Sequence, residues 1–154
     1  MTAAADVTSA HPTGTAVLRL DAGGTMWRLR SLVAMGHDAN RIALALQESP
    51  KAIQKLLRGE TADVTLELGD LTCELWNAWW DKRPPERTCT ERRLASAARR
   101  RAQRHDWCPP LGLDEDQFDE PGYRPYSRYR DATGTGVAMD FHPITARRHI
   151  GRSA

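Results

Sequence analysis

One segment constrains the fold more than any other: the stretch DANRIALALQESPKAIQKLLRG, from Asp38 to Gly59. Two runs of apolar residues at helical spacing flank the short polar piece QES. Asp38 and Ser49 precede these runs and are residue types that cap helix N-termini, and Pro50 suits a first helical position. Gly59 is typical of a helix end. The segment therefore predicts two short helices joined by a tight turn.

Three further helices are expected around this pair. The first has Thr25 as its cap and ends at Gly36, after the short extended piece AVLRLDAGGT. The second follows the capping hydroxyl of Thr65 and covers residues 66–80. The third, TERRLASAARRRAQRHDW, has Thr90 as its cap and ends before two prolines. The expected fold class is all-α: a small helical bundle containing a helix–turn–helix, plus a basic C-terminal helix and irregular tails.

The composition divides the chain into four parts. Residues 1–15 are small and polar without periodicity, and we expect a disordered lead-in there. Residues 16–82 hold most of the apolar side chains and are expected to form the helix–turn–helix domain. Residues 88–108 form the basic helix, and residues 109–154 are expected to be an irregular tail, first acidic and then basic. The net charge of +2 hides this separation of charge.

The second helix of the central pair carries a polar stripe opposite an apolar face. The stripe residues share one face because their offsets are 0, 3, 4 and 7, and they are Lys51, Gln54, Lys55 and Arg58. The major groove of B-DNA, about 12 Å wide, admits such a helix; Gln suits adenine, and Lys and Arg suit guanine or phosphate. An ordinary solvated face is the alternative. The very short preceding helix and the tight turn favour a DNA-reading pair.

The string GHDANRIALALQESPKAIQKLLRG resembles the helix–turn–helix of actinobacterial and actinophage regulators of the lambda-repressor-like class. The resemblance covers residues 21–125: DAGGTMWRLRSLVAMG looks like the lead helix, and RRLASAARRRAQRHDWCPPLGLDEDQFDEPGYRP looks like an Arg-rich C-terminal module. It implies a transcription regulator that binds double-stranded DNA. It also implies that Asn40 meets the phosphate backbone, and that base and phosphate contacts come from Ser49, Lys51, Gln54 and Lys55.

Two positions depart from the pattern of that class. Gln47 stands where a turn glycine is usual, so a residue with a Cβ must adopt or avoid a left-handed conformation, at a cost of about 1 kcal/mol. Glu48 replaces an apolar residue that normally fills the core, and its charge lies near the expected phosphates. Both departures bear on the geometry of the turn.

The expected basic helix carries six arginines against two acidic residues between Thr90 and Cys108. On a helix, one side carries Arg93, Arg100 and Arg104. Close to that side lie Arg92 and Arg99, and Arg101 is displaced from them. Such a strip can bind phosphates and steepen the salt dependence of binding. The alternative is an intramolecular clamp with the acidic run DEDQFDE, and the two states could alternate as autoinhibition.

A second candidate surface lies on the expected helix over residues 66–80. Its apolar face is wide because it carries four large apolar side chains close together, namely Leu75, Trp76, Trp79 and Trp80. A face this wide must be covered by a later helix or by a second subunit. The alternative function is therefore a protein–protein interaction module. Its partner would be a transcription-machinery or phage-related protein, or a second copy of the chain in a homodimer.

Other chemistry is not expected. Cys73, Cys89, His105 and Cys108 lack the close cysteine pair of a structural zinc site, so we expect no metal and no cofactor. The histidines are scattered and no phosphate-cradling glycine loop is present, so we expect no enzyme. Trp107, beside two prolines, is interpreted as a packing anchor for the tail. Without a secretory signal or a run of roughly 20 apolar residues, the expected location is the cytoplasm, at the nucleoid, with no membrane partner.

Overall fold

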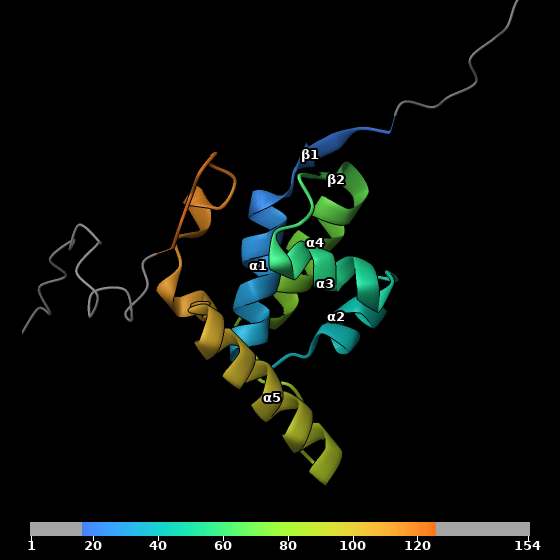
Figure 1. The fold of residues 1–154 in the computed structure, drawn as a ribbon, viewed down its shortest axis with the longest axis vertical. Coiled ribbons are helices and arrows are strands. Elements are labelled where there is room, and N and C mark those ends of the chain that lie inside the picture. The colour runs from blue at the N-terminus through green and yellow to red at the C-terminus, as the bar shows by residue number, and fades with distance from the viewer. Residues whose placement is uncertain (1–16, 126–154) are drawn as a thin grey trace, which may run out of the picture.

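The computed structural model describes residues 17–125, which form five α-helices and two short β-strands (Figure 1). The helices are α1 (Ala22–Met35), α2 (Ala39–Ala45), α3 (Pro50–Arg58), α4 (Leu66–Trp79) and α5 (Cys89–His105), and the strands are β1 (Arg19–Asp21) and β2 (Asp63–Thr65). Single 3-10 turns follow at Pro110–Gly112 and Glu115–Gln117. The lead-in expected over residues 1–15 and the basic end of the tail lie outside the described residues.

Helix α1 is the centre of the fold. It packs against α3, α4 and α5, and α2 packs against α3. Figure 1 shows α1 with the α2–α3 pair on one side and residues 110–125 on the other. The described part of the chain is therefore a small, mostly helical domain.

The expectation of an all-α chain missed a small sheet. Strands β1 and β2 pair antiparallel, with Leu20 opposite Val64, and Val64 is buried. Arg19 and Asp63, at opposite ends of the short ladder, reach each other across the strands and form an ion pair of 2.5 Å. Each strand has only three residues, too few for an alternating pattern, and the two pair across a long stretch of chain. Nothing local in the sequence therefore signals the pairing.

Three helix starts lie where the capping residues predict them. The Asp38 carboxylate accepts from the backbone amide of Asn40 at 2.9 Å, the Ser49 hydroxyl from that of Ala52 at 3.1 Å, and the Thr65 hydroxyl from that of Leu68 at 3.2 Å. These contacts satisfy amides that have no partner within the helix. Gly36 and Gly59 end their helices with positive φ angles of 109° and 75°, as expected for glycine.

Two helix starts were predicted too late. Helix α1 begins at Ala22 because the Asp21 carboxylate accepts from the Gly23 amide at 2.8 Å, and the predicted cap Thr25 lies buried inside the helix. Helix α5 begins at Cys89, where Thr88 and Glu91 form a reciprocal capping box. Thr88 and Thr90 can both cap a helix, but only Thr88 is followed three residues later by a glutamate, Glu91, which completes the capping box.

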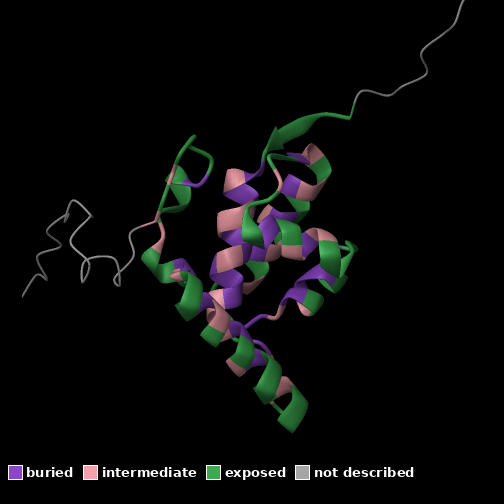
Figure 2. Cartoon of the chain, viewed as in Figure 1, coloured by how far each residue is buried: buried purple, intermediate pink, exposed green. Residues whose placement is uncertain are grey.

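The core lies between α1 and the helices around it. Its fully buried side chains include Leu29, Leu32, Ile42, Ile53 and Leu57. Figure 2 shows buried positions concentrated along α1 and on the neighbouring helices, while much of α5 is exposed. Helix α5 contributes only small buried residues, namely Ala95, Ala98 and Ala102, and this alanine face allows α5 to approach α1 closely.

Residues 109–125 were expected to be irregular, but they pack on the helices. Phe118 is 1% exposed and meets the Trp76 ring edge-on at 5.7 Å between centroids. Asp119 receives two hydrogen bonds from the Arg28 guanidinium, each 3.0 Å. Trp107 is buried, as expected of a packing anchor. The acidic run therefore completes the core with one phenylalanine that its composition does not reveal.

Within residues 17–125, no helix is both long enough and apolar enough to span a bilayer.

Candidate nucleic-acid interface

Helix α3 has the two opposite faces that its sequence predicts. Ile53, Leu56 and Leu57 are buried against the core, whereas Lys51 and Lys55 are exposed. The buried face fixes the orientation of the helix, because large side chains in a packed core allow little rotation. Two ammonium groups therefore project from the protein at neighbouring positions one helical turn apart.

Gln54, between these lysines on the same face, is half-buried and has a partner within the protein. Its Oε1 accepts a hydrogen bond from Arg101 Nη1 of α5 at 2.6 Å. Because a guanidinium can only donate, the amide oxygen must face Arg101, and the amide nitrogen keeps its two donors. This contact joins α3 and α5, and the sequence gives no signal for it.

Arg58 closes the predicted stripe and is exposed, but it pairs with Glu60. Its Nη2 donates to Glu60 Oε2 at 2.8 Å, and this hydrogen bond lowers the pKa of the Glu60 carboxyl. The pair lies at the C-terminal end of α3, where Arg58 is the last helical residue. Part of the charge of Arg58 is thus already neutralised, and the free cations of the stripe are Lys51 and Lys55.

The turn between α2 and α3 contains the two unusual residues, Gln47 and Glu48. Gln47 adopts a left-handed conformation with φ of 54°, so the glutamine occupies the position usual for glycine at the expected energetic cost. Glu48 is exposed and does not fill the core. Asn40, in the first turn of α2, is also exposed, and Ser49 serves as the N-cap of α3. The turn is formed without an apolar plug.

The six arginines of α5 fall into two groups. Arg93, Arg100 and Arg104 are exposed on the side that the helical spacing predicts. Arg92 is also exposed, but its Nη1 donates to the backbone carbonyls of Glu86 and Arg87 at 3.3 and 3.2 Å. The remaining two, Arg99 and Arg101, are half-buried and hold α5 to the rest of the domain.

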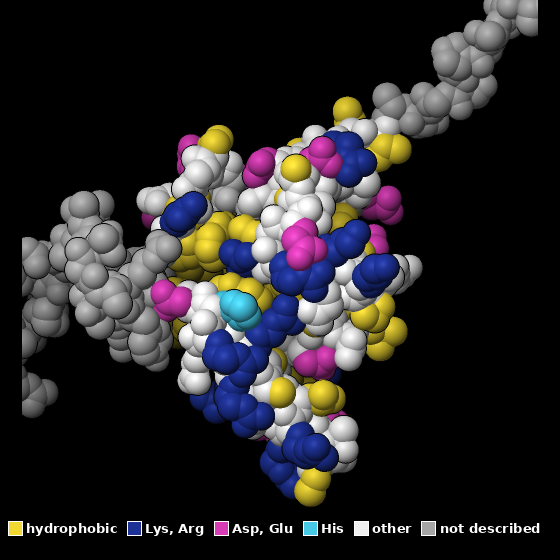
Figure 3. All heavy atoms as spheres, in the orientation of Figure 1, with side chains coloured by type: hydrophobic (Ala, Val, Ile, Leu, Met, Phe, Trp, Pro, Cys, Tyr) yellow, Lys and Arg dark blue, Asp and Glu magenta, His cyan; other side chains and the backbone are white. Residues whose placement is uncertain are grey.

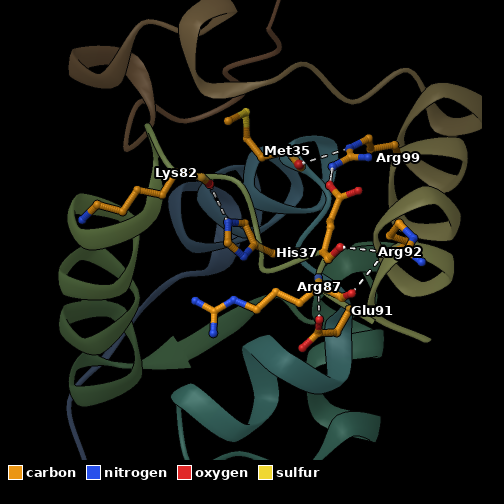
Figure 4. Close-up of polar contacts among 8 residues, drawn as sticks. Met35, His37, Lys82, Arg87, Glu91, Arg92 and Arg99 are labelled. Carbon is orange, nitrogen blue, oxygen red and sulfur yellow. Dashed lines mark hydrogen bonds and ion pairs between the residues drawn. The ribbon is translucent and has the colours of Figure 1, made fainter. Parts of the chain in front are cut away.

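Arg99 ties the middle of α5 to the end of α1 (Figure 4). Its Nη2 pairs with Glu86, whose carboxyl pKa it lowers, and its Nε donates to the Met35 carbonyl at 3.4 Å. A cation at the C-terminus of a helix also complements the helix dipole. Arg99 therefore occupies a structural position, away from the exposed arginines.

The cationic side chains of α3 and α5 gather on one face of the molecule. Figure 3 shows Lys and Arg side chains across α3 and continuing along α5 in the same view. The Gln54–Arg101 hydrogen bond links the two helices at this surface, and both pack against α1. Two segments more than thirty residues apart in the sequence therefore form one basic surface, which we call the α3–α5 face.

The acidic run does not clamp this face in the described structure. Its ion pair is directed to Arg28 of α1, whose side chain is 8% exposed. The hydrogen bond from Arg28 lowers the pKa of the Asp119 carboxyl. Among residues 17–125, no ion pair joins residues 114–120 to an arginine of α5.

The tryptophan-rich face of α4 is mostly covered by the chain itself. Trp76 is 6% exposed, and its indole nitrogen donates to the Ser31 hydroxyl at 2.9 Å. Trp79 lies between the His37 ring and the Arg41 guanidinium, at 4.6 and 4.8 Å. Trp80 remains 38% exposed, and Leu75 is partly buried. The tryptophans of α4 are therefore covered largely by Phe118 and by residues in and beside α2.

Within residues 17–125, no group of three or more His, Cys, Asp or Glu side chains is arranged to hold a metal ion.

The chain matches no protein family, no curated protein and no solved structure.

Proposed function

We propose that this chain is a transcription regulator that binds double-stranded DNA, with α2 and α3 acting as a helix–turn–helix. In this proposal α3 lies in the major groove. The observation that carries it is the α3–α5 face, where Lys51 and Lys55 stand exposed on a helix whose reverse side is buried. A rigid helix that presents donors and cations on one face meets the requirements for entering the groove.

The side chains of α3 divide between base and backbone. Gln54 lies half-buried between the two exposed lysines, and its amide nitrogen, which the contact with Arg101 leaves available, would donate to a base edge. Lys51 and Lys55 on either side suit guanine acceptors or phosphates. Ser49 and the first amides of α3 suit a phosphate at the edge of the groove, because the N-terminus of a helix attracts anions.

The exposed arginines of α5 extend the contact along the DNA backbone. Arg93, Arg100 and Arg104 carry no base-reading geometry of their own, and their exposed position suits phosphate contacts. Each phosphate that they neutralise should steepen the plot of log affinity against log salt by about 0.9. Binding by this surface is independent of sequence and adds affinity to the specific contacts of α3.

A random-oligonucleotide selection with the full chain tests the proposal and supplies the preferred duplex. On that duplex and on a scrambled one, Gln54→Ala should reduce the ratio of the two affinities, because a base contact carries discrimination of about 1–3 kcal/mol. Arg100→Ala should weaken both duplexes about equally. A selection that enriches no sequence, together with negligible losses from both variants, would contradict the proposal.

A second candidate is a protein–protein interaction module that uses the same helical scaffold. Its support is two large apolar side chains that remain exposed: Leu71 of α4 at 39% and Trp80, the residue that follows α4, at 38%. Two half-exposed side chains form a smaller patch than a stable interface needs. Size-exclusion chromatography of the free chain, combined with chromatography on a DNA resin, separates the two candidates. A dimer that does not bind the resin favours the interaction module.

A further inference from the structure

A groove with a volume of about 850 Å³ lies beside the α3–α5 face. Its walls come from the first half of α1, the C-terminal ends of α3 and α5, and residues 118–125. The groove is within the size range of ligand sites, about 300–1,000 Å³. It is distinct from the exposed face of α3, because Lys51, Gln54 and Lys55 do not line it.

Aromatic rings and guanidinium groups alternate along one wall of this groove. The Arg30 guanidinium lies over the Trp27 ring at 4.7 Å and over the Trp107 ring at 5.1 Å. Arg101 lies over the same Trp107 ring at 5.3 Å. We call these four residues, Trp27, Arg30, Trp107 and Arg101, the Arg–Trp ladder. Stacking holds both guanidinium groups in fixed positions while leaving most of their N–H donors available.

The ladder brings two cations together without an anion. Arg30 Nε donates to the Leu57 carbonyl at 2.9 Å, and Arg101 Nη1 donates to the Gln54 amide, so both partners are neutral. In the part of the chain that the structure describes, no carboxylate lies within ion-pair distance of either guanidinium. Arginines that are taken out of water are normally paired, whereas Arg30 and Arg101 are half-buried with the Trp107 ring between them and only neutral hydrogen-bond partners.

The electrostatics of the pair favour an added anion. Burial, and then the charge of Arg101, lower the pKa of Arg30 to about 10. Burial also lowers the pKa of Arg101, with further contributions from Arg58 and Arg104. An anion between the two guanidinium groups would reverse this unfavourable interaction, and it would act in a partly desolvated site where charges interact more strongly than in water.

The groove contains acidic residues as well, and they limit where an anion can lie. Asp21 accepts from the backbone at the start of α1, and Glu60 is paired with Arg58. Asp106 and Glu120 also line the groove. Two other arginines line the groove, but Arg58 is paired with Glu60 and Arg124 is exposed to solvent. The half-buried guanidinium pair of the Arg–Trp ladder is therefore the most favourable location for an anionic ligand.

We propose that the Arg–Trp ladder is a binding site for a phosphate group carried by a nucleotide. The phosphate oxygens accept from Arg30 and Arg101, and the aromatic wall beside them offers contact area to the rest of the nucleotide. Phosphate fits better than a carboxylate because its oxygens point in several directions and its charge can balance two guanidinium groups. The nucleotide is either a free mononucleotide or a unit of the duplex bound by α3, because both present the same group.

Calorimetric titration of the full chain with adenosine monophosphate tests this site, and adenosine is the matched ligand without phosphate. A second arm measures the salt dependence of binding to a 20-base-pair duplex. The variants are Arg30→Gln and Arg101→Gln, each compared with Arg87→Gln, which removes an exposed arginine before α5 and outside the groove. Thermal unfolding checks that each variant is folded. If Arg30→Gln does not fold, Arg30→Lys, which keeps the charge but loses the planar fork, takes its place.

For a free nucleotide, the monophosphate binds and adenosine does not, and both groove variants weaken the monophosphate by about tenfold or more while Arg87→Gln leaves it within twofold. For a duplex phosphate, the monophosphate does not bind, but each groove variant lowers the salt slope for the duplex by about 0.9 and Arg87→Gln does not. The site is rejected if neither arm distinguishes the groove variants from Arg87→Gln. Binding of the monophosphate without any binding of the duplex would reject the proposed function and leave this site standing.

Discussion

Helices α3 and α5 are both basic, yet they are held in the domain in different ways. Helix α3 is anchored by large side chains, and its cations lie on the opposite face, exposed to solvent. Helix α5 is anchored by alanines and, in addition, by two of its own arginines, Arg99 and Arg101. A helix with a strong apolar anchor can leave its cations free, whereas a helix with a weak one uses some of its cations as structural contacts.

This difference means that counting cations overestimates the binding surface of α5. Six arginines predict a continuous phosphate-binding strip, but Arg99 contacts Glu86 and the end of α1, and Arg92 contacts backbone carbonyls. Arg101 is half-buried and contacts Gln54, which leaves Arg93, Arg100 and Arg104 as the exposed arginines available for phosphate. The charge of an arginine follows from its sequence, but its role depends on which element lies within reach of its long side chain.

The largest expected effect tests the two anchors. Leu57→Ala should lower the free energy of unfolding by about 2–5 kcal/mol, because it leaves a cavity beneath α3. Ala98→Gly in the buried face of α5 should cost only about 1 kcal/mol, mainly through helix propensity. Urea unfolding of both variants measures the contrast. Equal losses would mean that α5 is anchored as strongly as α3.

A smaller effect separates structural from exposed arginines of α5. Arg99→Gln should lower the melting temperature by about 4–8 °C, because it removes contacts to Glu86 and to the Met35 carbonyl. Arg100→Gln, next to it and exposed, should leave the melting temperature nearly unchanged and weaken DNA binding instead. Scanning calorimetry and duplex titration measure the two properties. The same profile for both variants would show that Arg99 and Arg100 have the same role in the domain.

The turn before α3 offers a test in the opposite direction. Gln47→Gly should raise the free energy of unfolding by up to about 1 kcal/mol, because glycine adopts the positive φ of 54° without a steric cost from Cβ. Glu48→Gly, one residue later and without a positive φ, serves as the control and should not stabilise the domain. A destabilised Gln47→Gly variant would show that the glutamine side chain makes a contact worth more than the strain.

The smallest effect is a pH dependence at His37, which lies between α1 and α2 and contacts the end of α4. His37 Nε2 donates to the Lys82 carbonyl at 2.9 Å, while Nδ1 is buried without a partner (Figure 4). Burial lowers the pKa of His37 below 6.5, and nearby Arg41 and Arg99 add to this lowering against the opposing effects of Lys82 and Asp38. The unfolded chain therefore binds a proton at a higher pH than the folded chain does, and stability falls as pH drops below about 6.5.

Urea unfolding between pH 5 and 7.5 measures this effect. His37→Gln can still donate to the Lys82 carbonyl but does not titrate, so its stability should change less over the same interval. An identical pH dependence in both proteins would assign the effect to other groups.

Local chemistry was sufficient to predict most helices. Asp38, Ser49 and Thr65 act within three residues of the amides that they cap, so their role can be read from the sequence. The two opposite faces of α3 were also predictable, because helical geometry alone places the lysines opposite the leucines. The start of α1 was missed because two consecutive glycines, Gly23 and Gly24, are more typical of a break than of a first turn.

Contacts between distant segments could not be predicted in this way. Phe118 is one apolar residue within an acidic run, and only the space left beside Trp76 explains its burial. Arg101 reaches Gln54 across 47 positions of sequence, and Arg30 meets Trp107 only because α1 and α5 cross. These contacts decide which cations are free, so the sequence predicted the candidate surface on α3 better than the one on α5.

The most direct test of the proposed DNA-reading surface is the affinity of a matched pair of double variants for the selected duplex, measured by fluorescence anisotropy over a range of salt. Lys51→Gln/Lys55→Gln and Arg83→Gln/Arg87→Gln remove the same charge, the first from the exposed face of α3 and the second from the loop before α5. The account predicts that the α3 pair lowers the salt slope by about 1.8 and loses discrimination, while the loop pair changes neither. Equal losses from both pairs would show that net charge, and not the surface of α3, binds the DNA.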